Sequence, residues 1–341
     1  MKPFPHQYIE RKSGRIVREK FFADPLVRAL YGTIRERAPA LFRAATSARV
    51  SKWLGALNYD VPLSARLSSP ARLMRDLGID LRELRDPPTA LNTARKIFER
   101  KIRFETARPL PDNDAAILSP SDSRILPGSL DNESLFFVKE KFFSFPELLG
   151  ENSPWTRTFA GGDFAVFRLT PDKYHFNHVP ANGVVRDYYT LGGAFHACNP
   201  SAVCEILTPN SKNRRDVTIL DTDVPGGSGV GAVAMIEVVA LMIGEIVQCY
   251  SEHGYDEPQP MTVGKFLRRG NVKSLFRPGS STVILLFEKN RMRFSPDLLA
   301  NSRNARAASR YSGICGRTCV ETDICVREEI GVPAEIYDEY F

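Results

Sequence analysis

Most of the chain beyond residue 110 consists of short apolar runs bounded by Gly, Pro, Asn and Asp. Runs of this length, closed by turn-forming residues, are typical of strands joined by short connections. The sequence therefore predicts a mainly antiparallel β domain. The seven runs, in chain order, are ILSPSDSRILPG, SLFFVKEKFF, FAVFRLTPDKYH, NGVVRDYYTLGG, DVTILDT, AMIEVVALMIGEI and STVILLFEK.

The amino-terminal part has a different pattern. Up to about residue 84, apolar residues recur largely at steps of three and four among Arg and Ala, as amphipathic helices require. We therefore expect an α+β fold, divided into an N-terminal helical segment over residues 1–105 and a β-rich domain over residues 106–341. The apolar positions are Leu26, Leu30, Ile34, Leu41, Val50, Trp53, Leu54 and Leu57, with Pro39 and Pro62 between them.

Positive charge is concentrated in this helical segment. Residues 11–52 hold eleven Lys and Arg against three acidic residues, whereas the whole chain carries a net charge of +6. A basic segment on a near-neutral body favours a polyanionic partner, either anionic lipid or nucleic acid. The alternative is a solvated helix face. With 43% hydrophobic and 25% charged residues, the chain has the composition of a globular protein, not of a disordered one.

Membrane spans and targeting signals are not predicted. The first twenty residues contain no 7–15-residue apolar run, so we expect neither a signal peptide nor a transit sequence, and a location on the cytoplasmic face. The most apolar stretch, Gly229 to Gly244, has Glu237 at its centre and is shorter than the roughly 20 residues that a span needs. We interpret it as a core segment.

Cysteine and glycine motifs give little support for a metal or a nucleotide. Six Cys in a chain of this size are too few for a disulfide framework, so reduced thiols are expected. The spacing of Cys315, Cys319 and Cys325 is irregular for a metal site. The glycine run over residues 226–231 is not followed by the acidic residue that a dinucleotide site requires.

Three polar segments could carry chemistry. His175 and His178, three residues apart, could be a metal pair without a third ligand, or surface histidines. The segment from Gly279 leads from a small turn into an apolar strand, which suits an ordinary hairpin or a backbone self-cleavage site. Asp122, in a turn next to Pro120, could orient a histidine.

Taken together, these segments resemble the phosphatidylserine decarboxylase family of pyruvoyl-dependent enzymes. The family's D-Y-H-R-x-H-x-P-x-x-G motif is similar to Lys173 to Gly183, and its G-G-S-T-V-V-L-L-F motif to Gly279 to Phe287. Its P-A-D-G motif is similar to residues 120–123, and its F-F-x-R-K-L motif to residues 97–102, followed by Ala107-Arg108-Pro109. Departures from the family pattern are Ser123, Glu140, Lys173, Phe176 and Ser280.

The resemblance implies that the chain cuts itself. A serine hydroxyl attacks the preceding carbonyl, and the resulting ester is converted to a pyruvoyl group. His178 would take the hydroxyl proton, and Asp122 would hold its tautomer. In the family motif the nucleophile lies six residues before the closing Phe, and this spacing from Phe287 favours Ser281. Cleavage there gives chains of residues 1–280 and 281–341. Ser280, directly after Gly279, is the alternative nucleophile.

The resemblance also implies the reaction and the partners. The covalent pyruvoyl group, derived from Ser281, forms a Schiff base with the serine headgroup of phosphatidylserine in an anionic membrane, and decarboxylation gives phosphatidylethanolamine. His175 would reprotonate the product or position its carboxylate. Neither a metal nor nucleic acid is expected, and a homodimer is left open. The alternatives are a pyruvoyl-dependent decarboxylase of a soluble amino acid and a non-processed membrane-binding homologue.

Overall fold

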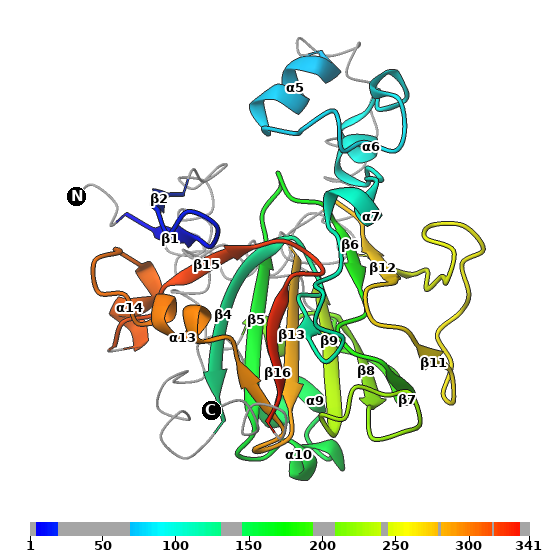
Figure 1. The fold of residues 1–341 in the computed structure, drawn as a ribbon, viewed down its shortest axis with the longest axis vertical. Helices are drawn as coiled ribbons and strands as arrows, with labels where there is room; N and C mark the ends of the chain where they lie inside the picture. Colours follow the sequence, from blue (N-terminus) through cyan, green and yellow to red (C-terminus); the bar gives the residue numbers. More distant parts are fainter. Residues whose placement is uncertain are drawn as a thin grey trace, which may run out of the picture.

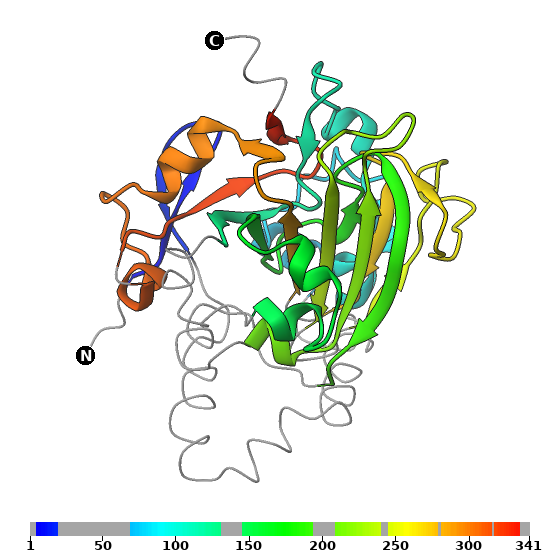
Figure 2. The same ribbon diagram turned by 90° about the horizontal axis from the view of Figure 1, so that it is seen from below.

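The computed structural model describes residues 5–19, 69–130, 145–193, 209–239, 245–278, 281–315 and 317–334. These residues form an α+β fold dominated by antiparallel strands, as the sequence predicts (Figures 1 and 2). Within the described residues, we find no helix long and apolar enough to cross a membrane.

One ten-stranded sheet is the framework of the molecule. All of its neighbouring strands are antiparallel except β1 and β15, which run parallel. The order across the sheet is β11 (Phe266–Leu267), β7 (Gly183–Leu191), β8 (Arg215–Asp221), β9 (Ala232–Val239), β13 (Ser281–Phe287), β5 (Asp163–Leu169), β4 (Ser123–Ser129), β15 (Glu321–Ile324), β1 (Gln7–Glu10) and β2 (Ile16–Arg18).

Strand β13 lies between β9 and β5 near the middle of this sheet, and all seven of its residues are buried. Burial on both faces explains its continuous apolar sequence. Val283, Leu285 and Phe287 point into one core, and Ile284 and Leu286 into the other. The strand that begins at Ser281 is therefore fixed from both sides.

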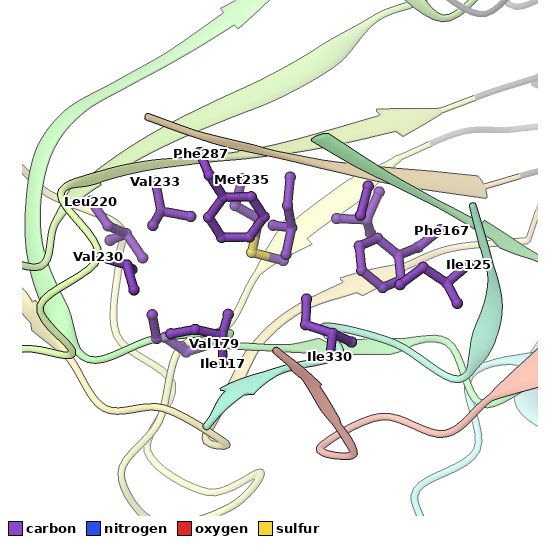
Figure 3. Packing of buried hydrophobic residues seen from close by; sticks show 14 of the residues in the cluster. Ile117, Ile125, Phe167, Val179, Leu220, Val230, Val233, Met235, Phe287 and Ile330 are labelled. Atoms are coloured by element: carbon purple, nitrogen blue, oxygen red, sulfur yellow. The ribbon is translucent and has the colours of Figure 1, made fainter. Parts of the chain in front are cut away.

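Two small sheets cover one face of the large sheet. They are β10 (Ile246–Gln248), β12 (Val272–Phe276) and β6 (Phe176–His178), and β14 (Met292–Phe294), β16 (Glu329–Pro333) and β3 (Ile117–Leu118). Figure 3 shows the core between the layers, where Phe287 and Met235 of the large sheet face Ile117, Val179 and Ile330.

Helices contribute to the other core and to a separate amino-terminal cluster. Leu148, Leu149 and Tyr311 pack on the second face of the large sheet. Met74, Leu84, Leu91 and Ile97 form the amino-terminal cluster. The short helices are α5 (Pro70–Asp76), the 3-10 helix η4 (Pro88–Ala90), α6 (Ala94–Phe98), α7 (Phe104–Ala107), α9 (Phe145–Leu149), α10 (Trp155–Thr158), α12 (Pro209–Lys212), α13 (Pro296–Ser302) and α14 (Arg310–Cys315).

The strand predictions are confirmed wherever the structure describes the chain. The run SLFFVKEKFF lies outside the described residues, as do the amphipathic positions from Leu26 to Leu57. The expected helical segment over residues 1–105 needs one correction, because residues 7–18 form a β-hairpin that joins the large sheet. Gly14, with φ of 68°, closes its turn, and Ile16 and Val17 favour the strand.

Candidate active site

His178 is the last residue of β6, and His175 directly precedes this strand. His178 pairs with Val272 of β12, and the amide of Phe276 donates to the carbonyl of His175 at 3.0 Å. Both side chains are buried, so they are not surface histidines. Among the described residues, the only group of three potential metal ligands is His6, Glu19 and Glu321, which contains neither of them.

Both ring nitrogens of His178 have partners. Nδ1 lies 2.8 Å from the carbonyl oxygen of Gly270, and Nε2 lies 3.0 Å from the hydroxyl of Tyr174. Because a carbonyl only accepts, Nδ1 carries the proton and Tyr174 donates to Nε2. Burial lowers the pKa of His178 to about 3, so the ring is a neutral base near pH 7.

His175 is neutral as well. Its ring stacks on Phe98 with 3.5 Å between centroids, and its Nδ1 is buried without a hydrogen-bond partner. Burial lowers its pKa well below the ordinary value, and the nearby Arg100 guanidinium adds to this shift. The site therefore holds a buried, neutral imidazole whose Nδ1 has no hydrogen-bond partner among the described residues.

Asp122 is anchored by other groups than His178. Nε and Nη2 of Arg108 donate to its two oxygens at 3.1 and 2.9 Å, and the amide of Val326 donates to Oδ1 at 2.8 Å. Burial alone would raise the pKa of Asp122, but the charge and hydrogen bonds of Arg108 hold it below its ordinary value. The expectation that Asp122 holds the His178 tautomer needs correction: the carbonyl of Gly270 does so here.

Ser281 is the first residue of β13 and is 1% exposed. It pairs with Leu169 on one side and with Val239 on the other. No hydrogen bond joins Ser281, His178 and Asp122 in the structure. Gly279 and the alternative nucleophile Ser280 lie outside the described residues.

A family model decides the relationship of this chain to known proteins. The phosphatidylserine decarboxylase model matches residues 94–312, which include Asp122, both histidines and Ser281. The chain belongs to the phosphatidylserine decarboxylase family. The resemblance of the sequence motifs is thus confirmed, and the chain is an enzyme of the carboxy-lyase type.

Individual phosphatidylserine decarboxylase proenzymes are similar over most of the chain. The proenzyme of Chlamydia pneumoniae is 31% identical over 87% of this chain and 92% of its own length. That of Fusobacterium nucleatum is 27% identical over 90% and 95%. Proenzyme 3 of Schizosaccharomyces pombe is 30% identical over 86% of this chain, which spans only 29% of that protein.

The sequence interpretation missed a buried ion pair on the same sheet face as Ser281. Glu237 of β9 pairs with Val283 of β13. Val283 is two residues after Ser281, so the three side chains lie on the same face of the sheet. Nζ of Lys273 lies 2.6 Å from its Oε2, and Nδ2 of Asn177 donates to its Oε1 at 3.0 Å. Both charged side chains are fully buried. A carboxylate at the centre of an apolar run was the available signal.

The aromatic surroundings of His178 were also missed. The ring of Phe104 meets the His178 ring edge to face at 4.8 Å. The hydroxyl of Tyr255 lies 2.8 Å from that of Tyr174 and donates to the carbonyl of Ile102. These residues are far apart in the sequence, and no contiguous motif contains them all.

Proposed function

We propose that this enzyme decarboxylates phosphatidylserine to phosphatidylethanolamine with a pyruvoyl group that it makes from Ser281. The observation that carries the proposal is the pair of buried, neutral imidazoles at His175 and His178, in a chain whose family match includes Ser281. A self-processing decarboxylase needs a base for the serine hydroxyl and a second group that takes up a proton and returns it to the product, and two neutral imidazoles can fill these roles.

We assign the proton of the Ser281 hydroxyl to Nε2 of His178. Because Nδ1 donates to the carbonyl of Gly270, Nε2 keeps the basic lone pair. The Tyr174 hydroxyl donates to this nitrogen, so that hydrogen bond must break before Nε2 can accept the serine proton. Asp122 supplies a negative charge that favours the protonated ring, since it raises the pKa of His178. We propose that Asp122 assists His178 through the electrostatic effect of its negative charge and not through a hydrogen bond.

The surroundings of position 281 fit a pyruvoyl group. Ser281 is nearly inaccessible to water and lies between Leu169 and Val239. In the segment before β6, Nδ1 of His175 is a buried polar atom without a hydrogen-bond partner among the described residues. The group would supply the carbonyl that condenses with the substrate amine and accepts the electrons released with carbon dioxide. We assign to His175 the return of a proton to the substrate carbon, and its free Nδ1 would first take this proton from the ammonium group of the substrate.

Two measurements test the proposed reaction. The intact mass of the purified protein reports self-cleavage, and carbon dioxide release is compared between phosphatidylserine vesicles, free serine and tryptophan. The proposal expects cleaved protein and release from the phospholipid only. Release from a free amino acid alone would support a soluble substrate, and an uncleaved, inactive chain would support the non-processed homologue.

We further propose peripheral binding to an anionic membrane at the cytoplasmic face through residues 11–60, whose structure is not described beyond residue 19. Each Lys or Arg near an acidic leaflet contributes about 1 kcal/mol. Changing Arg28, Arg35, Arg37 and Arg43 to Gln should reduce co-sedimentation with phosphatidylserine vesicles, and high salt should do the same to the wild type. Binding that neither change weakens would remove this anchor. The oligomeric state is measured in the same preparations.

A further inference from the structure

Arg327 is a buried cation with no acidic partner among the described residues. It lies in the turn between β15 and β16 and is 8% exposed. Its Nη1 donates to the carbonyl of Phe104 at 3.1 Å, while its Nε has no hydrogen-bond partner. In the part of the chain that the structure describes, no Asp or Glu oxygen lies within 4.0 Å of its guanidinium.

Buried arginines of this protein are held in two ways. Arg168 binds the carboxylates of Glu19 and Glu321, whereas Arg215 is held by backbone carbonyls of residues 147, 148, 211 and 213. A buried charge is stable when it is paired, because its desolvation is otherwise uncompensated. Among the acidic residues, the exposed Glu105 has the largest electrostatic effect on Arg327, but the two form no ion pair. Arg327 differs from Arg215 in that a single backbone carbonyl binds its guanidinium and its Nε is left open, which leaves room for an anion from outside the chain.

The backbone at this position favours glycine. Arg327 has φ of 70°, a left-handed conformation that costs free energy for any residue with a Cβ. The backbone of this turn would form at lower cost with Gly, so the backbone conformation gives no reason for Arg here. What the residue adds is its guanidinium.

This guanidinium lies against the groups that hold the His178 base. Its carbon is 5.0 Å from the centroid of the Phe104 ring, whose edge-to-face partner is His178. Its Nε would be 3.2 Å from a Cβ at Gly270, the residue whose carbonyl orients His178. Leu110, which is 39% exposed, packs on the same glycine, so Arg327 lies just below the surface. Figure 1 shows α7, which carries Phe104, beside β6 and β12.

We propose that Arg327 binds the phosphodiester of the phospholipid substrate. This inference rests on the proposed function. A planar guanidinium with a free Nε edge suits two hydrogen bonds to a phosphate. A contact with the substrate carboxylate is less suitable, because it would stabilise the charge that must leave as carbon dioxide. The phosphodiester keeps its charge throughout the reaction, so its contact stabilises substrate and transition state alike. Arg327 lies outside the residues that the family model matches.

The test replaces Arg327 with Gly, which removes the guanidinium and relieves the backbone. Asn290→Gly is the matched control, because Asn290 is also left-handed, with φ of 60°, in the turn after β13. With a soluble short-chain phosphatidylserine, Arg327→Gly should raise KM about tenfold and leave kcat within about twofold, as expected for uniform binding. Asn290→Gly should leave both unchanged. Arg327→Lys should fall between wild type and Arg327→Gly.

Two further readouts separate this inference from the proposed function. Calorimetric binding of glycerophosphoserine, which needs no turnover, should weaken about tenfold in Arg327→Gly, whereas binding of free serine should not change. Self-cleavage should proceed normally. Unchanged KM and unchanged glycerophosphoserine binding would overturn the assignment, and so would a loss of kcat and self-cleavage at constant KM, which would make Arg327 a structural support. An inactive wild type that still binds glycerophosphoserine through Arg327 would contradict only the proposed reaction.

Discussion

The carbonyl of Gly270 accepts a hydrogen bond from Nδ1 of His178 at 2.8 Å, across 92 residues of sequence. This contact decides which ring nitrogen is basic. Gly270 has φ of 77°, and a Cβ there would lie 2.6 Å from Leu110 and 3.2 Å from Arg327. Position 270 therefore requires glycine for two reasons: its left-handed backbone conformation and the lack of space for a Cβ.

Gly270→Ala should slow self-cleavage. The methyl group must displace Leu110 or shift the backbone, and a shift moves the carbonyl away from His178. We expect at least about a tenfold slower conversion, on the scale of a misplaced catalytic contact. Gly264→Ala is the control, because Gly264 has φ of 86° but nothing within 4 Å of a Cβ. Equal rates in the two variants would show that the Gly270 contact does not matter for cleavage.

The two histidines should have separable roles. His178→Ala and Asp122→Asn should accumulate uncleaved chain, whereas His175→Ala should be cut and should lose turnover by about 10²-fold or more, the usual loss for a general acid or base. Gel analysis gives the cleaved fraction, and activity is expressed per cleaved molecule. Asp297→Asn, which breaks an exposed ion pair with Arg11, is the control. Identical cleavage defects with normal turnover in all three site variants would contradict the division.

Stability should fall on mild acidification because the buried histidines are neutral. The pKa of His178 is about 3 in the folded chain and about 6.5 in the unfolded chain, so the unfolded state binds more protons below pH 6.5. Its contribution is complete above pH 6.5 and is lost progressively towards pH 3. Between pH 6.5 and 5 we expect a loss of about 2 kcal/mol from this residue.

Urea unfolding of uncleaved Ser281→Ala protein at pH 6.5 and 5 measures this loss. Adding His178→Gln should reduce the pH effect by the same amount, whereas adding His253→Gln, which changes an exposed histidine, should not. A pH effect that is the same with and without His178 would mean that this ring is not buried in its neutral form.

The Glu237–Lys273 pair should matter more for stability than an exposed pair. Glu237→Gln or Lys273→Met leaves one charge buried alone, which typically costs about 3–5 kcal/mol. The double variant should recover part of this loss. Arg186→Gln, which removes the partner of Asp221 at the surface, should cost at most about 1 kcal/mol. Denaturant unfolding of the uncleaved Ser281→Ala chain compares them, and equal losses would show that water reaches the buried pair.

Local patterns predicted the strands because burial and alternation are local properties. The run from Ser281 to Phe287 reads as a strand since every residue is buried, and the Tyr-His motif indicated His175 and His178. The hairpin over residues 7–18 was missed because its partner, β15, is some 300 residues away. A basic, short, half-exposed hairpin carries little apolar pattern of its own.

The partners of the site residues could not be predicted for a similar reason. Gly270, Tyr255 and Arg327 reach His178 or its neighbours only through tertiary packing, and none of them belongs to the motif that contains His178. Arg108 was part of a recognisable Ala-Arg-Pro element, but its bidentate contact with Asp122 depends on the fold. The sequence therefore indicated site residues that belong to a contiguous motif, but it could not predict which residues contact them.

The intact mass of purified wild type, Ser281→Ala and Ser280→Ala proteins tests the central claim most directly. The account predicts that the wild type consists of residues 1–280 and a second chain that begins at position 281 with a blocked, pyruvoyl amino terminus. Ser281→Ala should remain a single chain of about the full 38.2 kDa, and Ser280→Ala should still be cut. A wild-type protein that stays whole would contradict the account. Normal cutting of Ser281→Ala, together with an intact Ser280→Ala chain, would assign the nucleophile to Ser280.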